Sequence, residues 1–453
     1  MLETLLTLAT IISTIFTIAL LLIPKRYIKH SPPMATQNGA SVEPKISVQV
    51  LVLGDIGRSP RMQYHAMSIA KHGGRVDLIG YEESELPSSL TDNPLITIVP
   101  LPLPPSNLRD GTLPFFFAGP CKVLWQIWTL FIVLCYTTKP ARWLLVQNPP
   151  SIPTFFVAYL VCLIRNTHLI IDWHNYGWTI LAGTRGPKHI FVRLYKWYEA
   201  FLGSWAPTAS FTVSKAMERQ LRESPYKIKS PIFTLHDRPA SIFQPITDEE
   251  KRRAFLQRLP ETKDHVDAIM NGDVRLLDFN LLLDALVKYG PFAEFDCPPI
   301  LAIITGKGPQ KQMYLDRIAE LTESYDLVNV TIKTAWLSIE DYASLLACAD
   351  LGVCLHKSSS GVDLPMKVVD MFGAGLPVVG YDQYFSWPEL VQEGINGWGF
   401  TTAKDLAEIL EEVFKDTSGK ELARLKKGAI EEGRKRWDEE WDGVAGRLLG
   451  LID

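Results

Sequence analysis

The sequence offers little material for disulfide bonds or a metal site. Its 453 residues include only six cysteines, with no Cys-x-x-Cys pair and no metal-ligand spacing to a histidine. Scattered cysteines favour free thiols in a reducing compartment. The formal net charge is only −4, so no basic excess points to nucleic acid as a partner. We find no internal repeat, and the length allows two or three domains.

The first feature that is present is an uncharged run, rich in Leu, Ile and Thr, at residues 4–24. A run of this length can cross a bilayer as a helix. No Lys or Arg precedes it and no small-x-small cleavage pattern follows, which disfavours a cleaved signal peptide. Basic residues follow at once in 25–29, so the positive-inside tendency predicts that the rest of the chain faces the cytosol. We therefore expect a transmembrane anchor at 1–24 and a polar linker at 25–43.

A second apolar stretch, residues 115–136, has two interpretations. Gly119-Pro120 breaks the pattern, and the remaining 123–136 is too short to span a bilayer. A buried core helix is one interpretation. A helix lying in the membrane surface is the other, because the stretch carries aromatic residues typical of that interface. These residues are Trp125, Trp128 and Tyr136.

Near the amino terminus, the strand predicted at 46–53 runs into a glycine-containing turn at Gly54 and Gly57. The turn lacks the third glycine of the dinucleotide fingerprint, which disfavours a dehydrogenase. Arg58 and Arg61 follow, and arginine suits bidentate contact with phosphate. The alternative is two solvated arginines at a helix start.

A later strand, predicted at 168–172, ends directly in the sequence DWHNYGWT. Residues just past the carboxyl end of a parallel strand face the ligand crevice. A reaction in which a hydroxyl group attacks needs a general base to remove its proton. His174, Asp172 and Asp55 are the candidates by position, and a structural role is the alternative for His174.

In the carboxyl-terminal half, residues 351–381 predict a strand, a polar loop, a short helix and another strand. Pro365 fits the first position of the helix, expected at 366–374, and Gly375 fits its end. A helix start facing a loop of small residues can bind an anion, most commonly a diphosphate. An ordinary strand–helix crossover with an unused helix end is the alternative.

Side chains around this helix start fit a nucleoside diphosphate. Lys367 can add a positive charge, and Asp370 can accept hydrogen bonds from ribose hydroxyls. A second glycine-containing turn after the strand predicted at 300–305 can also approach a phosphate. The candidate donor-binding residues are Gly306, Lys307, Gly308, Ser359, Ser360, Gly361, Asp363, Leu364, Lys367 and Asp370.

Four motifs in this order resemble one family. The motifs are GDIGRSPRMQYHA at 54–66, DWHNYGWT at 172–179, HDRP at 236–239 and SSSGVDLPMKVVDMFGAGLPVV at 358–379. The last is similar to the nucleotide-sugar half of GT-B glycosyltransferases. All four together resemble the chitobiosyldiphosphodolichol beta-mannosyltransferases, glycosyltransferase family 33.

The resemblance implies an α/β GT-B fold, with two Rossmann-like domains facing a central cleft and a transmembrane helix before them. We place the acceptor domain at 44–240, the nucleotide-sugar domain at 241–435 and a carboxyl-terminal helix at 436–453. In this setting Gly54, Gly57, Arg58 and Arg61 would serve the acceptor diphosphate.

The resemblance also implies the reaction. Mannose would pass from GDP-mannose to GlcNAc2-diphosphodolichol with inversion, forming a β-1,4 link, the first mannosylation of the N-glycan precursor. The enzyme would lie in the endoplasmic reticulum membrane with its domains in the cytosol, without a metal or other cofactor. Other mannosyltransferases of lipid-linked oligosaccharides would be further partners, and nucleic acid would not.

One segment departs from the family pattern. Residues 264–280 read DHVDAIMNGDVRLLDFN, where an apolar opening strand and a donor-facing loop are expected. We therefore expect both to be missing or replaced, because of either a mis-joined gene model or real variation. Two alternatives follow: a catalytically impaired paralogue acting as a membrane-bound interaction partner, or a GT-B enzyme with a different donor sugar.

Overall fold

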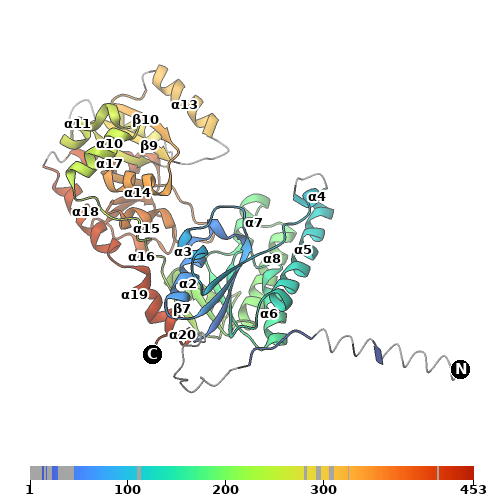
Figure 1. The fold of residues 1–453 in the computed structure, drawn as a ribbon. Helices are drawn as coiled ribbons and strands as arrows, with labels where there is room; N and C mark the ends of the chain where they lie inside the picture. Colours follow the sequence, from blue (N-terminus) through green and yellow to red (C-terminus); the bar gives the residue numbers. More distant parts are fainter. Residues whose placement is uncertain are drawn as a thin grey trace, which may run out of the picture. The chain divides into compact units, whose positions relative to one another are not determined.

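The computed structural model forms two compact units that the chain enters more than once (Figure 1). Unit 1 comprises residues 1–211, 220–233 and 444–453, and unit 2 comprises 212–219 and 234–443. The structure describes residues 13–14, 17, 23–28, 45–109, 114–279, 283–291, 297–305, 311–324, 326–415 and 418–453. Most of the predicted anchor and linker lies outside these residues.

Unit 1 is built on a seven-stranded sheet with the order β3-β2-β1-β4-β5-β6-β7. The pairs among the first five strands of this order are all parallel. The order reverses between β1 and β4, and ligands of such sheets bind outside the carboxyl ends of strands at this point. The strands are β1 Ser47–Asp55, β2 Arg75–Tyr81, β3 Ile96–Pro100, β4 Trp143–Asn148, β5 His168–Trp173, β6 Ala209–Thr212 and β7 Ile232–Thr234.

The helices of unit 1 follow the sequence signals closely. The second helix begins at Pro60, where the missing N–H costs nothing, and ends before Gly73 at φ +82°. Ser214 caps the start of α9, accepting a hydrogen bond from the N–H of Met217 at 3.0 Å. The helices are α2 Pro60–Lys71, α3 Ser88–Thr91, α4 Ser106–Arg109, α5 Phe115–Ile132, α6 Thr154–Arg165, α7 Gly177–Arg185 and α8 Ile190–Trp205. Helix α9, Lys215–Arg222, begins in unit 2 and ends in unit 1.

The expected break at Gly119-Pro120 is absent. α5 runs through Pro120 and continues into a π-helical turn, Val133–Thr137. A proline near a helix start removes one hydrogen bond to the first turn, and the remaining turns are unaffected. Within the described residues, 117–137 is long and apolar enough to cross a membrane, and only 22% of its most apolar window is buried. The prediction that this stretch is too short is therefore wrong.

Unit 2 is built on a six-stranded, fully parallel sheet with the order β10-β9-β8-β11-β12-β13. β8 lies at its centre and pairs with β9 and β11, so the expectation that the opening strand is missing is wrong. Charged residues flank the short apolar centre of this strand, so its sequence does not look like a buried strand. Leu276 and Leu277 in that centre are buried. The strands are β8 Arg275–Phe279, β9 Ile300–Thr305, β10 Val330–Ala335, β11 Leu351–Cys354, β12 Val378–Tyr381 and β13 Gly397–Phe400.

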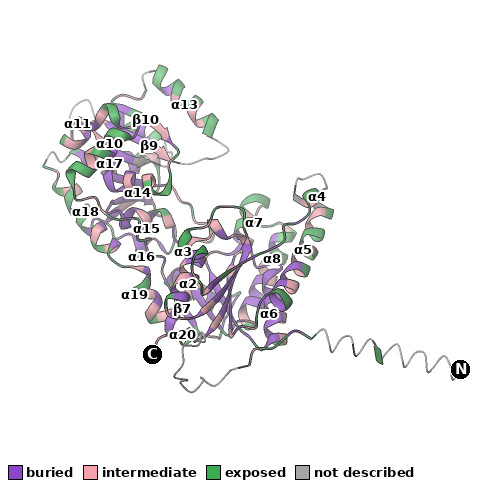
Figure 2. Ribbon diagram, in the orientation of Figure 1, coloured by how far each residue is buried: buried purple, intermediate pink, exposed green. Residues whose placement is uncertain are grey.

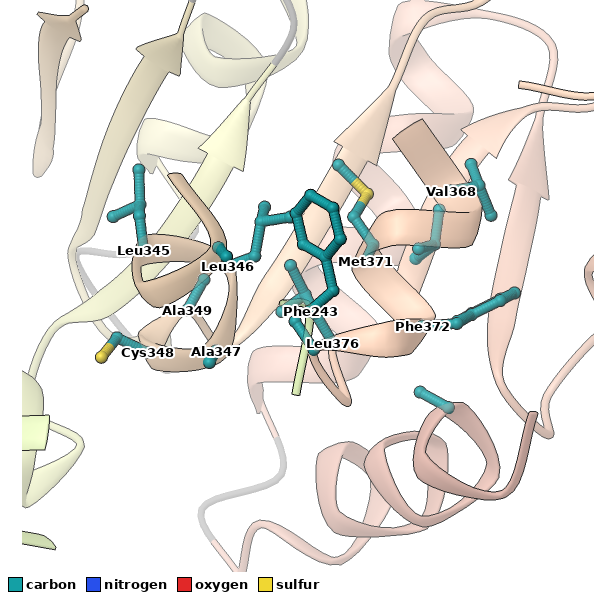
Figure 3. Close-up of a cluster of buried hydrophobic side chains, with 14 of the residues drawn as sticks. Phe243, Leu345, Leu346, Ala347, Cys348, Ala349, Val368, Met371, Phe372 and Leu376 are labelled. Atoms are coloured by element: carbon teal, nitrogen blue, oxygen red, sulfur yellow. The ribbon is translucent and has the colours of Figure 1, made fainter. Parts of the chain in front are cut away.

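Buried apolar side chains hold the helices of unit 2 against its sheet (Figure 2). Phe243 lies between Leu346 of α14 and Met371 of α15 in this core (Figure 3). The helices are α10 Glu249–Arg258, α11 Val266–Asn271, α12 Leu283–Tyr289, α13 Lys311–Glu323, α14 Ile339–Cys348, α15 Met366–Gly373, α16 Trp387–Leu390, α17 Ala403–Lys415, α18 Lys420–Gly433 and α19 Trp437–Trp441; α20 Arg447–Leu449 belongs to unit 1.

Candidate active site

A buried carboxylate at the carboxyl end of β5 organises the polar groups of unit 1. Asp172 is fully buried and accepts two hydrogen bonds from Arg61 of α2: Nε to Oδ2 at 2.8 Å and Nη2 to Oδ1 at 2.9 Å. His174 Nε2 lies 2.9 Å from Asp172 Oδ2, and His65 Nε2 lies 3.3 Å from the same oxygen. Two predicted catalytic residues and one predicted acceptor-binding residue therefore meet at one point.

The charges of this cluster are fixed by burial and pairing. Burial would raise the pKa of Asp172, but Arg61 and His174 hold that pKa well below its usual value. Burial lowers the pKa of His65 despite the nearby carboxylate, so its ring is neutral at pH 7. Asp172 is thus an anion held mainly by Arg61.

His174 is the member of the cluster that reaches solvent. Its side chain is 23% exposed, whereas those of Asp172, His65 and Arg61 are 2% exposed or less. A carboxylate bonded to one ring nitrogen orients the imidazole and leaves its other nitrogen to exchange a proton. The arrangement can therefore take up a proton at the surface through His174.

Asp55, the third predicted catalytic residue, caps a turn. Its Oδ1 accepts from the N–H groups of Gly57, Glu83 and Ser84 at 3.1–3.3 Å, and its Oδ2 accepts from Ser84 Oγ at 2.5 Å. These hydrogen bonds outweigh desolvation and lower the pKa of Asp55. A Cβ at Gly57 would lie 2.8 Å from Ser84 Cβ, so the close approach requires glycine. The geometry favours a positioning role for Asp55.

The predicted acceptor-binding residues differ in accessibility. Gly54 and Gly57 lie at the end of β1 and in the following turn. Arg58 is 83% exposed, with Nε 3.2 Å from Ser84 Oγ. Arg61 is 2% exposed, and its guanidinium makes a bidentate contact with Asp172. Of the two arginines, only Arg58 presents its guanidinium to solvent.

A second buried acid, Glu199 of α8, holds the loop that carries His174. It accepts hydrogen bonds from Gly177 N at 2.9 Å, Ser151 Oγ at 3.0 Å and Tyr226 Oη at 2.7 Å. Burial raises its pKa. Sequence reasoning assigned Glu199 no role, although an acid amid the aromatic residues of this helix was a usable signal.

In unit 2, the loop after β11 is organised by Asp363. This carboxylate accepts from His356 Nε2 at 2.8 Å, from Ser360 Oγ at 3.0 Å and from Ser358 Oγ. Burial would raise the pKa of Asp363, but these hydrogen bonds lower it. Gly361 adopts φ +78° and donates its N–H to Ser358 Oγ at 2.7 Å. The predicted donor loop therefore has a defined internal structure, with Asp363 facing its own loop.

The start of α15 lies at the end of this loop. The helix begins at Met366, so Pro365 is its N-cap rather than its first residue, and no side chain caps the helix. Lys367 is exposed. Burial and the carboxylate of Asp237 raise the pKa of Asp370 to about 7, against the effect of Lys367. The helix head can therefore meet a ligand with backbone N–H groups and a lysine.

The remaining predicted donor residues belong to two segments, the loop before α15 and residues 306–308. Ser359 is exposed and Leu364 is buried. Gly306, Lys307 and Gly308 lie outside the described residues. In the sequence they directly follow β9.

The HDRP motif of unit 2 belongs to a charged network that sequence reasoning did not find. Glu389 accepts from the N–H groups of Lys215 and Ala216 at 2.6 and 2.7 Å, at the start of α9. His236 bridges Glu389 at 3.3 Å and Glu440 at 2.7 Å. The network is structural, because its carboxylates are already bonded within the unit. Across the described residues, no three His, Cys, Asp or Glu side chains form a group that could hold a metal ion.

Comparisons with known proteins agree with this architecture. The sequence-family model described as glycosyl transferases group 1 matches residues 281–416. Sucrose-phosphate synthase from Thermosynechococcus elongatus has a similar structure, with a TM-score of 0.60 at 14% identity over 90% of this chain and 98% of that one. This similarity shows the GT-B fold alone.

Sequence relatives are closer. The chitobiosyldiphosphodolichol beta-mannosyltransferase of Arthroderma benhamiae is 48% identical, over 94% of this chain and 96% of that protein. The protein of that name from Mus musculus is 38% identical, over 88% of each chain. With this identity along nearly the whole length, the chain belongs to the chitobiosyldiphosphodolichol beta-mannosyltransferase family of glycosyltransferases.

Proposed function

We propose that this chain transfers mannose from GDP-mannose to chitobiosyl diphosphodolichol, forming a β-1,4 link with inversion. The family assignment gives the reaction class. The observation that carries the mechanism is the pair of His174 and buried Asp172 at the carboxyl end of β5. We also propose that the reaction occurs on the cytosolic face of the endoplasmic reticulum, as the basic residues at 25–29 favour.

In the proposed step, His174 is the general base. Its imidazole removes the proton from the 4-hydroxyl of the terminal GlcNAc as that oxygen attacks C1 of mannose. The C1–O4 bond forms on one face while the bond from C1 to the phosphate oxygen breaks on the other, so the configuration inverts. GDP leaves with the bonding electrons, and Asp172 stabilises the imidazolium.

The proposed donor contacts come from unit 2. The first N–H groups of α15 and the ammonium of Lys367 meet the diphosphate, since a helix start without a side-chain cap favours an anion. Lys307, which follows β9 in the sequence, would add a second cationic contact. Asp370 would bond the ribose hydroxyls.

The proposed acceptor contacts come from unit 1. Arg58, exposed beside the turn after β1, would pair with the acceptor diphosphate. Arg61 would act through Asp172 as a positioning residue, because its fork is buried on that carboxylate.

The test is transfer by the purified full chain to a chitobiosyl diphospholipid. Labelled GDP-mannose, labelled UDP-GlcNAc and a no-donor sample are compared. We expect mannose alone to be incorporated, with a β-linkage by glycosidase digestion. Incorporation of another sugar, or lipid binding without any turnover, would overturn the proposal in favour of another donor or an inactive paralogue.

The role of His174 is tested with His174→Gln and the matched control His168→Gln, at the other end of the same strand. We expect His174→Gln to lower kcat by roughly 10²–10⁴-fold, the usual range for a lost general base. The control should retain activity. Equal rates for His174→Gln and the wild type would exclude this residue as the base.

A further inference from the structure

The helix α8 exposes an apolar stripe to solvent. Exposed apolar residues recur at helical spacing along it: Ile190, Leu194, Trp197, Phe201 and Trp205. Trp197 and Phe201 stack at 5.6 Å, and Phe201 meets Trp205 edge-on at 5.6 Å. The usual place for such a stripe is the core, but these side chains are 47–63% exposed.

The neighbouring helices extend this surface. α6 exposes Phe156 and Leu163, and α5 exposes Phe117, Leu124 and Trp128. Tyr159 of α6 packs on Trp205 of α8 with ring centres 4.5 Å apart. The helices α5, α6 and α8 lie on one side of the sheet of unit 1 (Figure 1), and each bears exposed residues (Figure 2). We call the exposed side chains of these three helices the apolar face.

The charges of this region have one sign at the surface. Residues 114–206 contain two acids, Asp172 and Glu199, and both are fully buried. The same residues contain eight Lys and Arg, of which Arg165 is buried and the other seven are at least partly exposed. The eight are Lys122, Lys139, Arg142, Arg165, Arg185, Lys188, Arg193 and Lys196. A surface with apolar, Trp-rich and basic character and no exposed acid is complementary to anionic lipid.

The chain that follows the amino-terminal apolar run is attached to this region. Tyr27 donates its N–H to Arg165 O at 2.7 Å, and Arg165 Nε donates to Lys25 O at 3.1 Å, at the end of α6. A bilayer that holds the uncharged run at 4–24 would therefore lie next to α6. This attachment favours a lipid surface over a protein as the occupant.

We propose that the apolar face of α5, α6 and α8 lies in the interfacial layer of an anionic membrane. Its aromatic side chains enter the boundary between head groups and acyl chains, and its basic side chains meet the head groups. If the proposed function holds, the same contact brings unit 1 to the head group of a lipid-linked acceptor. The membrane contact itself does not depend on which sugar is transferred.

The chain offers its own labelling site for the test. Cys121 lies on α5 and is exposed, and the other five cysteines are buried. The full chain, labelled at Cys121 with an environment-sensitive maleimide dye, is reconstituted in vesicles with phosphatidylserine and nitroxide-labelled lipid. We expect quenching of about twofold or more, since an interfacial helix buries its apolar face about 5–10 Å deep.

The matched control carries the dye on unit 2, in the double variant Cys121→Ser, Lys404→Cys. Lys404 is an exposed residue of α17, and we expect no quenching there. Equal quenching at both positions, or none at Cys121, would overturn the proposal. A dye at Cys121 that is equally shielded without lipid would indicate a second copy of the chain instead, and would also overturn it.

A second measurement uses exposed residues, so that folding is spared. The variants are Leu194→Glu and Trp197→Glu on α8, with Met313→Glu on α13 as the matched exposed apolar control. We expect the α8 variants to lose about tenfold in transfer to a bilayer-embedded acceptor, because an acid is repelled by the anionic surface. Transfer to a short-chain, water-soluble acceptor should be unchanged, and Met313→Glu should match the wild type with both.

The outcomes separate the two proposals. Equal loss with both acceptors in the α8 variants would contradict the membrane role of this face. A wild-type chain that transfers no mannose to either acceptor, but is quenched at Cys121, would contradict the proposed function and support the membrane contact.

Discussion

Arg58 and Arg61 lie in one motif, three residues apart, but in opposite environments. Arg58 is 83% exposed beside Ser84, whereas Arg61 is 2% exposed and makes two bonds to Asp172. The residue type allows either situation, because arginine suits both phosphates and buried carboxylates. The partner of each side chain therefore decides its role.

Replacement by lysine should separate these roles. Arg61→Lys loses the bidentate geometry and leaves Asp172 poorly compensated, so we expect the free energy of unfolding to fall by about 3 kcal/mol. Arg58→Lys should change it by less than about 0.5 kcal/mol, as for most surface substitutions. Denaturant unfolding measures both changes. A similar loss of unfolding free energy in the two variants would show that the buried pair contributes no more to stability than the exposed arginine.

Asp370 predicts a pH dependence. Its folded pKa is about 7, against an ordinary value of 3.8, so the folded state holds this proton between about pH 4 and pH 7 while the unfolded state releases it. The contribution of Asp370 to stability is therefore full below about pH 4 and falls as the pH rises through 7. In Asp370→Asn the fall in the free energy of unfolding that Asp370 causes between about pH 4 and pH 7 should vanish. Denaturant unfolding across this pH range measures it.

Asp237 supplies the matched comparison for Asp370. Its carboxylate raises the pKa of Asp370, so Asp237→Asn should lower that pKa and shift the stability decrease to lower pH. An unchanged pH profile in both variants would argue against the elevated pKa.

At the scale of elements, the position of α15 depends on its contact with α18. Gly433 at the end of α18 lies so close to α15 that a Cβ would overlap the carbonyl oxygen of Phe372. Gly373 is also tight, since a Cβ there would overlap the Cβ of Pro239 and lie 2.9 Å from the Cβ of Phe243. These glycines set how closely the helix with the proposed diphosphate site packs on its neighbours.

A methyl group at Gly433 should therefore destabilise the protein. We expect Gly433→Ala to lower the free energy of unfolding by about 2 kcal/mol through overpacking, although alanine normally favours a helix. The control is Gly443→Ala, because a Cβ at Gly443 meets no atom within 4 Å. Thermal unfolding compares the stability of the two variants. If Gly433→Ala were more stable than the wild type, α18 would be able to shift away from α15.

Elements with strong local signals can be explained from the sequence. The start of α2 at Pro60 and the Ser214 cap of α9 follow from residue types alone. β8 was missed because its charged ends hide a short apolar centre, and pairing with β9 and β11 makes it a central strand. A break in α5 was predicted at Gly119-Pro120 because both residues disfavour a helix interior. Pro120 lies near the start of α5, and the sequence does not show that the helix already begins at Phe115.

At the scale of the molecule, each unit has its own sheet and its own candidate half-site. The chain crosses between the two units four times, and residues 444–453 return to unit 1. The proposed base lies on unit 1, and the proposed diphosphate site lies on unit 2. Binding of donor and loss of the acceptor proton should therefore respond to different substitutions.

Calorimetric titration with GDP should show this separation. We expect Lys367→Gln to weaken GDP binding about tenfold, as for a lost charge-assisted contact of about 1.4 kcal/mol. His174→Gln and the surface control Lys404→Gln should bind GDP like the wild type. If His174→Gln weakened GDP binding as much as Lys367→Gln, the division of roles between the units would be wrong.

The sequence by itself determined the alternation of strands and helices, the family and the residues near the site. These features rest on local periodicity, caps and short motifs, which need no distant partner. Only the tertiary structure decided that Arg61 meets Asp172, because the two are 111 positions apart in the chain. It also decided that the apolar stripe of α8 faces outward, since helical spacing defines a face but only packing determines what covers it.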